Sequence, residues 1–322
     1  MISLSKFTTI LITHLLESGR YGTARAYRSA LNRLVIYWGS DEISFADISP
    51  AMLKSYEQYL FHRGCKRNTV SLYMRMLRSI CNQAANRGIC NIQKGLFEEV
   101  FTHTDSSEKR AVSPSVIRKI REAKLPVGSM LDFSRNMFLL SFYLRGIPFV
   151  DLIHLRKKDI NHGVLRYRRS KTGKLLTVGL EPCATEIFRK YASAVKKSPY
   201  LLPIIKGEGL EAYRQYQNAL RGYNLYLHKL SAFLKLNVNL TSYVARHSWA
   251  TAAYRQGIPV AIISESMGHS SEKITYTYLA SFDNRTLCHA NRKVIALVID
   301  KILPTVISDK ILNDKRTQLF PL

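Results

Sequence analysis

Apolar periodicity breaks off between Thr102 and Val112, and this break divides the chain into two parts. The segment contains the run Asp-Ser-Ser-Glu-Lys-Arg, whereas well-patterned sequence lies on both sides of it. A chain of 322 residues is long enough for two domains that each bury a core of their own. We therefore expect a first domain at 1–101, a linker at 102–112, a second domain at 113–300 and a tail at 301–322.

The first 101 residues carry the pattern of a helical bundle. Apolar residues recur every three or four positions, which places them on one face of each helix. Each apolar segment ends at a glycine, and glycine is suited to the left-handed conformation that closes a helix. These glycines are Gly19, Gly39, Gly64 and Gly88. The last predicted helix of the bundle, from Thr69 to Gly88, has a basic side.

The second part is also helical in pattern, with one exception. A helix is expected to begin at Ser113-Pro114, and a longer apolar helix runs from Ser129 to near Arg145. Between Val164 and Leu180, two short extended runs flank Ser-Lys-Thr-Gly, which is typical of a β-hairpin. From Ala184 onward the helical pattern returns. The expected fold class is therefore mainly α, with a small β-hairpin or sheet in the second domain.

The chain is strongly basic, and this charge limits the classes of molecule that it is expected to bind. Lys and Arg number 48 against 23 acidic residues, and the net charge of +25 would repel itself unless a polyanion neutralised it. Nucleic acid is the natural polyanion. The apolar runs are too short to cross a bilayer, and Met1 to Gly19 lacks the pattern of a signal peptide. The five cysteines show neither CxxC pairs nor regular spacing with histidine, so we expect no zinc site, no disulfide framework and a reducing cytoplasm.

Short segments of the second domain stand out together. They are Tyr-Leu-Arg-Gly around Arg145, Ser-Lys-Thr-Gly-Lys from Ser170, Ala-Arg-His-Ser-Trp-Ala-Thr from Ala245, Met-Gly-His-Ser-Ser from Met267 and Thr-Tyr-Thr-Tyr-Leu from Thr275. Any one of them is common by chance, but the ordered set resembles the phage integrase, or tyrosine recombinase, family. The resemblance spans essentially the whole chain. It implies a SAM-like helical core-binding domain followed by an α+β catalytic domain that cleaves and rejoins DNA with no cofactor.

The chemistry of phosphodiester cleavage explains why such a family needs two arginines. Attack on a phosphodiester adds negative charge to the nonbridging oxygens, and a planar, permanently charged guanidinium can bind those oxygens bidentately. The resemblance assigns Arg145 and Arg246 to this role. Taken alone, Arg145 would instead be interpreted as a cation that neutralises the C-terminal dipole of an apolar helix.

The resemblance also supplies a nucleophile, a proton donor and a histidine. Tyr278 matches the nucleophile, which would form a 3′-phosphotyrosyl link that stores the energy for rejoining. Its rival, Tyr276, lies two residues away and so on another helical face. Lys171, at the tip of the predicted hairpin, matches the lysine that protonates the leaving 5′-oxygen, with Lys174 as its competitor. His269 matches the histidine that hydrogen-bonds the phosphate or steadies the nucleophile.

Three further positions belong to the resemblance. Tyr243 stands where the family usually has a histidine, and a phenol can hydrogen-bond phosphate but is a poor base near neutral pH. Either Tyr243 acts as a donor only, or the histidine's role passes to a neighbour or to water. His247 follows Arg246 as in the motif and is expected to pack or cap. Asp151 lies near the family's acidic residue and is expected to orient an arginine or the fold.

Basic residues in both domains are candidate contacts to the DNA backbone, although each could equally be a solvated charge. They are Lys66, Arg67, Arg75, Arg78, Arg166, Arg168 and Arg169. The resemblance implies a C-shaped clamp on double-stranded DNA and a homotetramer on two recombination sites, formed by a protein that could be monomeric in solution. A C-terminal helix would link neighbouring protomers, with packing inside its own protomer as an open alternative.

Two other functions stay open at this point. A type IB topoisomerase shares the nucleophile but relaxes DNA without exchanging strands, and the compact N-terminal bundle favours recombination over it. A catalytically silent DNA-binding or architectural protein would keep the fold, and Tyr243 is compatible with it. Among recombinases, the absence of a preceding arm domain favours a Xer-like resolvase or a DNA invertase at the nucleoid. Integration, excision and inversion all remain possible outcomes.

Overall fold

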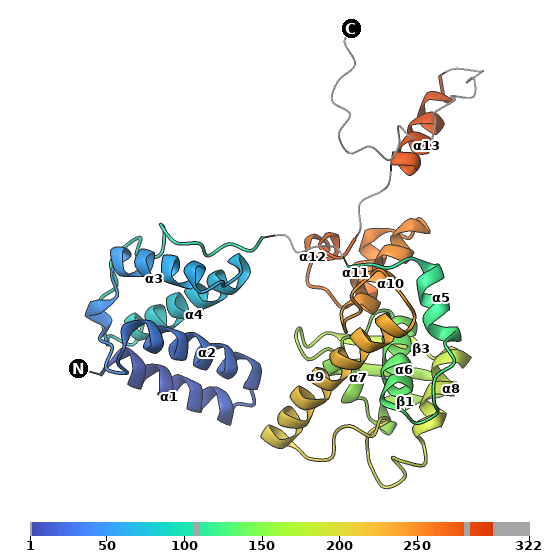
Figure 1. The fold of residues 1–322 in the computed structure, drawn as a ribbon, viewed down its shortest axis with the longest axis horizontal. Helices are drawn as coiled ribbons and strands as arrows, with labels where there is room; N and C mark the ends of the chain where they lie inside the picture. Colours follow the sequence, from blue (N-terminus) through green and yellow to red (C-terminus); the bar gives the residue numbers. More distant parts are fainter. Residues whose placement is uncertain (1, 106–109, 280–283, 299–322) are drawn as a thin grey trace.

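The computed structural model describes residues 2–105, 110–279 and 284–298, and most of its elements gather in two lobes (Figure 1). Both lobes are built mainly from helices, and the second also contains one small sheet. The predicted fold class is therefore confirmed. Among the helices of the described ranges, none combines the length and the apolar character that a membrane crossing requires.

The first lobe is a helical bundle within residues 2–105. The Ser49 hydroxyl caps the third helix by accepting a hydrogen bond from the Met52 amide at 3.2 Å. The apolar faces meet in one core, with Tyr56 and Leu77 fully buried in it. The helices lie where the sequence predicted them: α1 (Leu4–Glu17), α2 (Tyr21–Trp38), α3 (Pro50–His62) and α4 (Arg67–Ala85).

A buried carboxylate ties the end of this lobe to its core. Glu57 in α3 accepts a hydrogen bond from the Phe101 amide at 2.6 Å and pairs with the Lys54 ammonium at 2.9 Å. The Arg67 guanidinium pairs with Asp105 at 2.9 Å and lies over the Phe101 ring, 4.4 Å from its centroid. The backbone therefore stays attached to the first lobe as far as Asp105.

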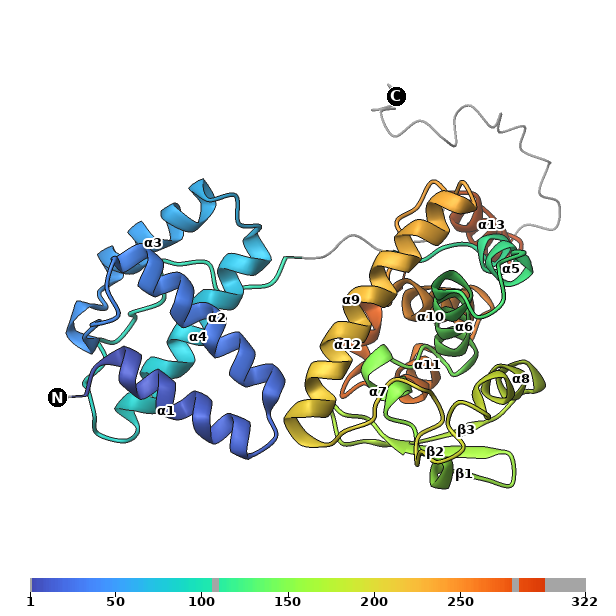
Figure 2. The same cartoon turned by 60° about the horizontal axis from the view of Figure 1, so that its bottom comes forward.

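The second lobe is organised around α6 (Met130–Tyr143), which is buried along its middle at residues 136–141. It packs against α8 (Pro182–Tyr191), α9 (Gly209–Phe233) and α10 (Val244–Arg255) (Figure 2). A helix with neighbours on several sides must be apolar nearly all round, as this segment is. The other helices of the lobe are α5 (Pro114–Glu122), α7 (Phe149–Ile153), α11 (Val260–Ser266) and α12 (Glu272–Tyr276).

An antiparallel sheet lies along one side of this lobe in the order β1-β2-β3 (Figure 2). The predicted hairpin is present as β2 (Val164–Arg168) and β3 (Leu175–Gly179). Alternation along β2 buries Leu165 and Tyr167 and exposes Arg166 and Arg168. The third strand, β1 (Ile160–Asn161), was not predicted, because two residues are too few to show an alternating pattern.

Two contacts join the lobes where the start of α2 meets the start of α9 (Figure 2). The rings of Tyr21 and Tyr213 lie with their centroids 5.3 Å apart. One turn further along both helices, the Arg25 guanidinium donates a hydrogen bond to the Gln217 side-chain oxygen. Successive turns of the two helices therefore meet, because residues four apart share one helical face.

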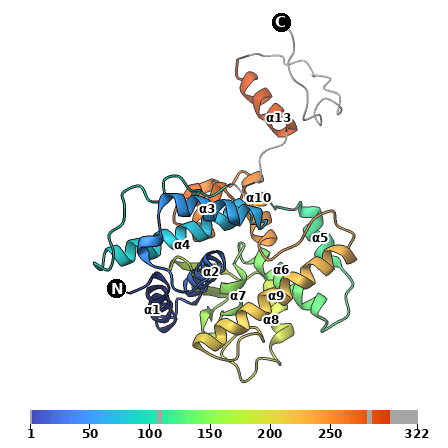
Figure 3. The same cartoon turned by 60° about the vertical axis from the view of Figure 1, so that its left-hand side comes forward.

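A last helix, α13 (Asn284–Ile295), lies apart from both lobes in two different views (Figures 1 and 3). Its apolar side chains are uncovered: Leu287 is 53% exposed and Val294 is 63% exposed. The tail predicted at 301–322 lies outside the described residues.

Candidate active site

The turn after α6 brings Arg145 to the start of α10. Arg145 and Gly146 both have left-handed backbone conformations, with φ of 58° and 71°. A Cβ atom on residue 146 would lie 3.0 Å from the Arg246 Cα, so only glycine fits this close approach. The Gly146 carbonyl accepts a hydrogen bond from Arg246 Nη1 at 2.5 Å. Two arginines a hundred positions apart are thus brought together by one glycine turn.

Arg246 is buried at the centre of the cluster, with 2% of its surface exposed. Its Nη2 donates to the Met267 carbonyl at 2.8 Å and lies 2.8 Å from His269 Nε2. Burial and the neighbouring Arg169 lower the pKa of Arg246, while the Tyr278 phenol and a hydrogen bond to it raise that pKa. The guanidinium is therefore fixed in orientation by protein groups before any substrate arrives.

The protonation state of His269 follows from its two partners. Its Nε2 faces Arg246, which can only donate, so Nε2 must accept. The proton then sits on Nδ1, which donates to the Thr275 hydroxyl at 2.8 Å. Burial, followed by the charges of Arg246, Arg169, Lys171 and Lys174, lowers the pKa of this imidazole to about 3. His269 is consequently neutral at physiological pH and serves as a hydrogen-bonding group.

The ring of Tyr278 lies between two imidazoles. Its centroid is 4.6 Å from that of His247 and 5.0 Å from that of His269. The central carbon of the Arg246 guanidinium lies 5.3 Å from the same centroid. Tyr276 is instead 53% exposed on α12. The structure thus brings Tyr278, rather than its rival, against the buried arginine.

Asp151 and Arg169 form a buried pair beside this cluster. Asp151, in α7, accepts a hydrogen bond from the Ser170 amide at 2.9 Å, and its other oxygen lies 3.7 Å from Arg169 Nε. Arg169 Nη1 donates to the carbonyls of Met267 at 2.9 Å and Gly268 at 3.1 Å. The arginine that Asp151 contacts is therefore Arg169.

The prediction that Arg169 contacts DNA needs correction, because only 6% of this residue is exposed. The physical reason is strand alternation. Arg169 has the same parity as the buried Leu165 and Tyr167, so its side chain points inward with theirs. The sequence therefore contained the signal, but three arginines in four positions suggested a uniformly solvated patch.

The predicted proton donor lies on the turn between β2 and β3. Lys171 and Lys174 are both exposed, and both lie near enough to His269 to lower its pKa. The Thr172 hydroxyl donates to the Gly268 carbonyl at 3.3 Å, which joins the turn to the segment before His269. Arg145 Nη1 donates to the Thr177 carbonyl of β3 at 3.3 Å, so the same hairpin also meets the first arginine.

Tyr243 and His247 flank Arg246 at the start of α10. Tyr243 is 53% exposed, and partial burial of its phenol, followed by the nearby Tyr278, raises its pKa. It stays protonated near neutral pH and can donate a hydrogen bond. His247 is mostly buried, and its Nδ1 lies 3.3 Å from the Tyr278 carbonyl. Burial lowers the pKa of His247.

Two members of the cluster were missed from the sequence. Thr275 is fully buried and accepts the hydrogen bond from His269 Nδ1; its position on the short helix directly before Tyr278 was the available signal. Tyr167 is buried on β2, and its pKa is raised by burial and by Asp151 but lowered by Arg246, Arg169 and Arg145. Its phenol therefore lies among the arginines, which the alternating strand pattern alone could not reveal.

The other candidate DNA contacts lie on both lobes. Lys66, Arg67 and Arg78 are exposed and Arg75 is half-buried on the first lobe, while Arg166 and Arg168 are exposed on the second. Several already bond within the protein, such as Arg78 with the Thr102 hydroxyl at 3.4 Å and Arg168 with the Gly173 carbonyl at 3.2 Å. These exposed contacts are weak enough for a phosphate to replace them.

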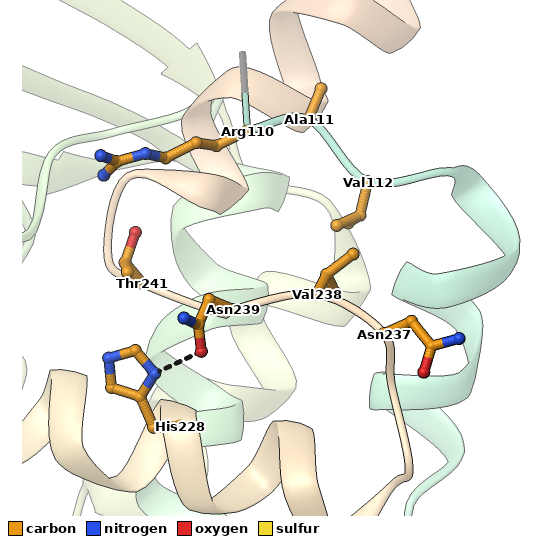
Figure 4. Close-up of a pocket in the computed structure, with 8 residues that line it drawn as sticks. All are labelled: Arg110, Ala111, Val112, His228, Asn237, Val238, Asn239 and Thr241. Atoms are coloured by element: carbon orange, nitrogen blue, oxygen red, sulfur yellow. Dashed lines mark hydrogen bonds between the residues drawn. The ribbon is translucent and has the colours of Figure 1, made fainter. Parts of the chain in front are cut away.

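A separate cavity of about 420 Å³ lies where residues 110–112 meet the segment 237–241 (Figure 4). It is lined by polar groups, among them Arg110 and His228, and the His228 ring is hydrogen-bonded to Asn239 at 3.0 Å. The residues assigned to phosphate chemistry by resemblance do not line it. The candidate active site is therefore the arginine, histidine and tyrosine cluster rather than this cavity.

Comparisons with known proteins agree with this arrangement of the chain. The sequence profile described as the Phage integrase SAM-like domain matches residues 3–98. The profile described as the Phage integrase family matches residues 115–285, which is more than half of the 322 residues.

Curated relatives of this chain are named tyrosine recombinases. The protein named Tyrosine recombinase XerA from Pyrococcus furiosus is 27% identical over 172 residues, which cover 52% of this chain and 56% of that protein. The Tyrosine recombinase of Pseudothermotoga lettingae is 22% identical over 285 residues, which cover 84% of this chain and 91% of the relative. The match thus spans little more than half of the first relative and nearly all of the second.

Solved structures share the fold at low sequence identity. The Tn1549 transposon integrase in complex with transposon right end DNA superposes with a TM-score of 0.60, at 14% identity over 92% of this chain and 100% of that one. A lambda integrase dimer bound to a COC′ core site gives a TM-score of 0.59, at 16% identity over 88% of this chain and 80% of that one. With both lobes matched by family profiles, this chain belongs to the phage integrase family.

Proposed function

We propose that this protein is a site-specific DNA recombinase, which cleaves and rejoins DNA through a 3′-phosphotyrosyl bond to Tyr278. The observation that carries the proposal is the contact of the Tyr278 ring with Arg246 and His269 inside the second lobe. Family membership supports the same conclusion, as do relatives named tyrosine recombinases and similar structures solved in complex with DNA.

In this proposal the two arginines hold the scissile phosphate. Arg246 is already oriented by the Gly146 and Met267 carbonyls, so little rearrangement is needed when a phosphate oxygen binds. The exposed hydrogen bond from Arg145 to Thr177 is weak enough to exchange for a phosphate oxygen. Tyr243, which keeps its proton, would donate a further hydrogen bond in place of the usual histidine.

The chemical step then balances without an external energy source. The Tyr278 oxygen bonds to phosphorus while its proton departs to water, and the bond from phosphorus to the 5′-oxygen breaks. Lys171 gives a proton to that 5′-oxygen. Rejoining reverses these transfers with a 5′-hydroxyl from the same strand or from a partner strand. The neutral His269 stays a hydrogen-bond acceptor toward Arg246 throughout.

The deciding experiment incubates the protein with a nicked suicide duplex and, separately, with a supercoiled plasmid that contains two intact sites. A covalent adduct and exchanged strands support a recombinase. Relaxation of supercoiled DNA without exchange would indicate a type IB topoisomerase, and binding without any adduct would indicate a silent architectural protein. Because the adduct reports cleavage and the exchange reports partner choice, the three functions give different results.

We also propose that the lobes act as a clamp of two domains, joined by a linker at 102–112, around double-stranded DNA at the nucleoid. Separate apolar cores in the two lobes support this division. Integration, excision and inversion are all compatible with the same chemistry.

Binding should weaken steeply with salt, because the chain carries a net charge of +25 and exposed basic residues on both lobes. A protein that neutralises about six phosphates loses roughly a thousandfold in affinity between about 50 and 200 mM salt. Fluorescence anisotropy with a labelled duplex measures this slope. A flat response over that range would contradict charge-driven docking.

The proposed homotetramer would use α13, whose apolar residues Leu287 and Val294 are uncovered in the isolated chain. Changing both to Ser should reduce the assembly of two-site complexes by about tenfold, since burial of these apolar side chains against a neighbouring protomer would no longer stabilise the complex. Single-site binding should not change. Native gel shifts with one or two sites measure both effects, and Leu225→Ser, at a position 52% exposed on α9, is the matched control. Unchanged two-site assembly would favour packing within one protomer.

A further inference from the structure

Two buried guanidiniums meet at one backbone carbonyl. Arg169 and Arg246 are 6% and 2% exposed, and they donate to the Met267 carbonyl at 2.9 Å and 2.8 Å. Two positive charges that share one carbonyl oxygen repel each other inside a protein, where water does not screen them well. Keeping Arg169 in this place therefore costs free energy, which the neighbouring groups must offset.

Specific contacts offset the burial of Arg169. The Asp151 carboxylate lies 3.7 Å from its Nε, and the Gly268 carbonyl accepts from its Nη1 at 3.1 Å. Gly268 has a φ of 66°, and a Cβ atom there would lie 3.0 Å from the Arg169 Cδ. The segment before His269 thus provides both the acceptors and the space that this arginine needs.

The backbone of Arg169 closes the turn on which Lys171 lies. The Arg169 amide donates to the Lys174 carbonyl at 2.9 Å, and its carbonyl accepts from the Gly173 amide at 2.8 Å. One residue therefore closes the hairpin turn through its backbone and anchors it through its side chain. The anchor points are the carbonyls of Met267 and Gly268, directly before His269.

Two further hydrogen bonds also hold the hairpin turn against the body of the lobe. Asp151 accepts from the Ser170 amide at 2.9 Å, and the Thr172 hydroxyl donates to the Gly268 carbonyl at 3.3 Å. The residues on both sides of Lys171 are therefore tied to the body of the lobe, while Lys171 itself remains exposed. A lysine side chain has many rotamers, so fixing its backbone is the main way to limit where its ammonium can reach.

We propose that Arg169 is a positioning residue, which holds the hairpin turn against the Met267-Gly268 segment so that Lys171 can protonate the leaving 5′-oxygen. This inference rests on the proposed recombinase function. Arg169 does not touch the DNA in this role, and its own burial explains why. It makes the position of the proton donor depend on the same carbonyl that orients Arg246.

The protonation step can be isolated by changing the leaving atom. When the bridging 5′-oxygen of the scissile phosphate is replaced by sulfur, the leaving group is a thiolate, whose conjugate acid has a pKa of only about 8.5, so it departs far more readily than an alkoxide and needs no proton during departure. Cleavage of this substrate still requires Tyr278 and the phosphate-binding arginines. It no longer requires a proton from Lys171.

The test compares single-turnover cleavage of the two substrates by full-length Arg169→Met. The oxygen substrate should be cleaved about a hundredfold more slowly than by the wild type, which is the low end for losing general acid catalysis. The sulfur substrate should be cleaved within about threefold of the wild-type rate, because its leaving group needs no general acid and a displaced Lys171 therefore has little effect. Lys171→Ala should show the same pattern, and Arg189→Met, at an exposed position on α8, should match the wild type on both.

Equal losses on both substrates would overturn the proposal, as would an unchanged rate on the oxygen substrate. If Arg169→Met does not fold, Thr172→Val replaces it, because this change removes only the hydroxyl bond to Gly268. It should slow the oxygen substrate about fivefold, as expected for one hydrogen bond, and the sulfur substrate should again restore the rate. Failure of the proposed function itself looks different, since the wild type would then form no adduct with either substrate.

Discussion

Replacing Tyr278 with Phe is expected to abolish the covalent protein–DNA adduct while leaving DNA affinity unchanged. The change removes the attacking oxygen but keeps the ring, which can still pack between His247 and His269. Loss of a nucleophile lowers the rate at least about ten-thousandfold, because no neighbouring group can replace the missing bond. A denaturing gel of protein incubated with an end-labelled nicked duplex measures the adduct.

Tyr276→Phe is the matched control for this experiment. Tyr276 is 53% exposed on α12 and should tolerate loss of its hydroxyl with a wild-type yield of adduct. An adduct that persists in Tyr278→Phe and disappears in Tyr276→Phe would transfer the nucleophile to the other tyrosine. An adduct that persists in both variants would contradict the proposed chemistry on α12 and its following turn.

Arg246→Lys is expected to lower the single-turnover cleavage rate by about a hundred- to a thousandfold, the range seen when one preorganised charge donor is lost. Lysine keeps the charge but has no planar fork, so it cannot bond Gly146, Met267 and a phosphate oxygen together. The unpaired carbonyl should also lower the free energy of unfolding by about 1–3 kcal/mol. Quench-flow cleavage and thermal melting measure the two effects separately.

Arg255→Lys is the corresponding control, because Arg255 is exposed at the end of the same helix, α10. It should cleave at the wild-type rate and melt at the wild-type temperature. A wild-type rate for Arg246→Lys would mean that charge alone matters at this position. That result would remove the bidentate contact from the proposed mechanism.

The fold was predictable from the sequence where an element depends on residues close to it in the chain. The helices of the first lobe follow from apolar spacing and from glycines such as Gly39, which adopts the left-handed conformation expected of a helix end. The hairpin follows from a change of period and from Gly173, which has a positive φ in the turn. Strand β1 escaped prediction because its pairing with β2 depends on a partner, and two residues contain no period.

The candidate site was predictable as a set of residue types, since the order of Arg145, Lys171, Arg246, His269 and Tyr278 resembles a known family. Their contacts were not predictable in the same way. The opposite orientations of Arg168 and Arg169 illustrate the difference. Two adjacent arginines have the same chemistry, yet one is exposed on a strand and the other is buried beside Asp151.

By itself, the sequence determined that the chain is mainly helical, carries a large excess of positive charge and contains the ordered residues of one family. Only the tertiary structure decided that His269 is neutral, that Thr275 accepts its hydrogen bond and that Arg169 faces inward. The physical reason is the range of the interactions. Helix patterns depend on residues three or four apart, whereas burial and hydrogen-bond partners in the site come from segments up to a hundred positions away.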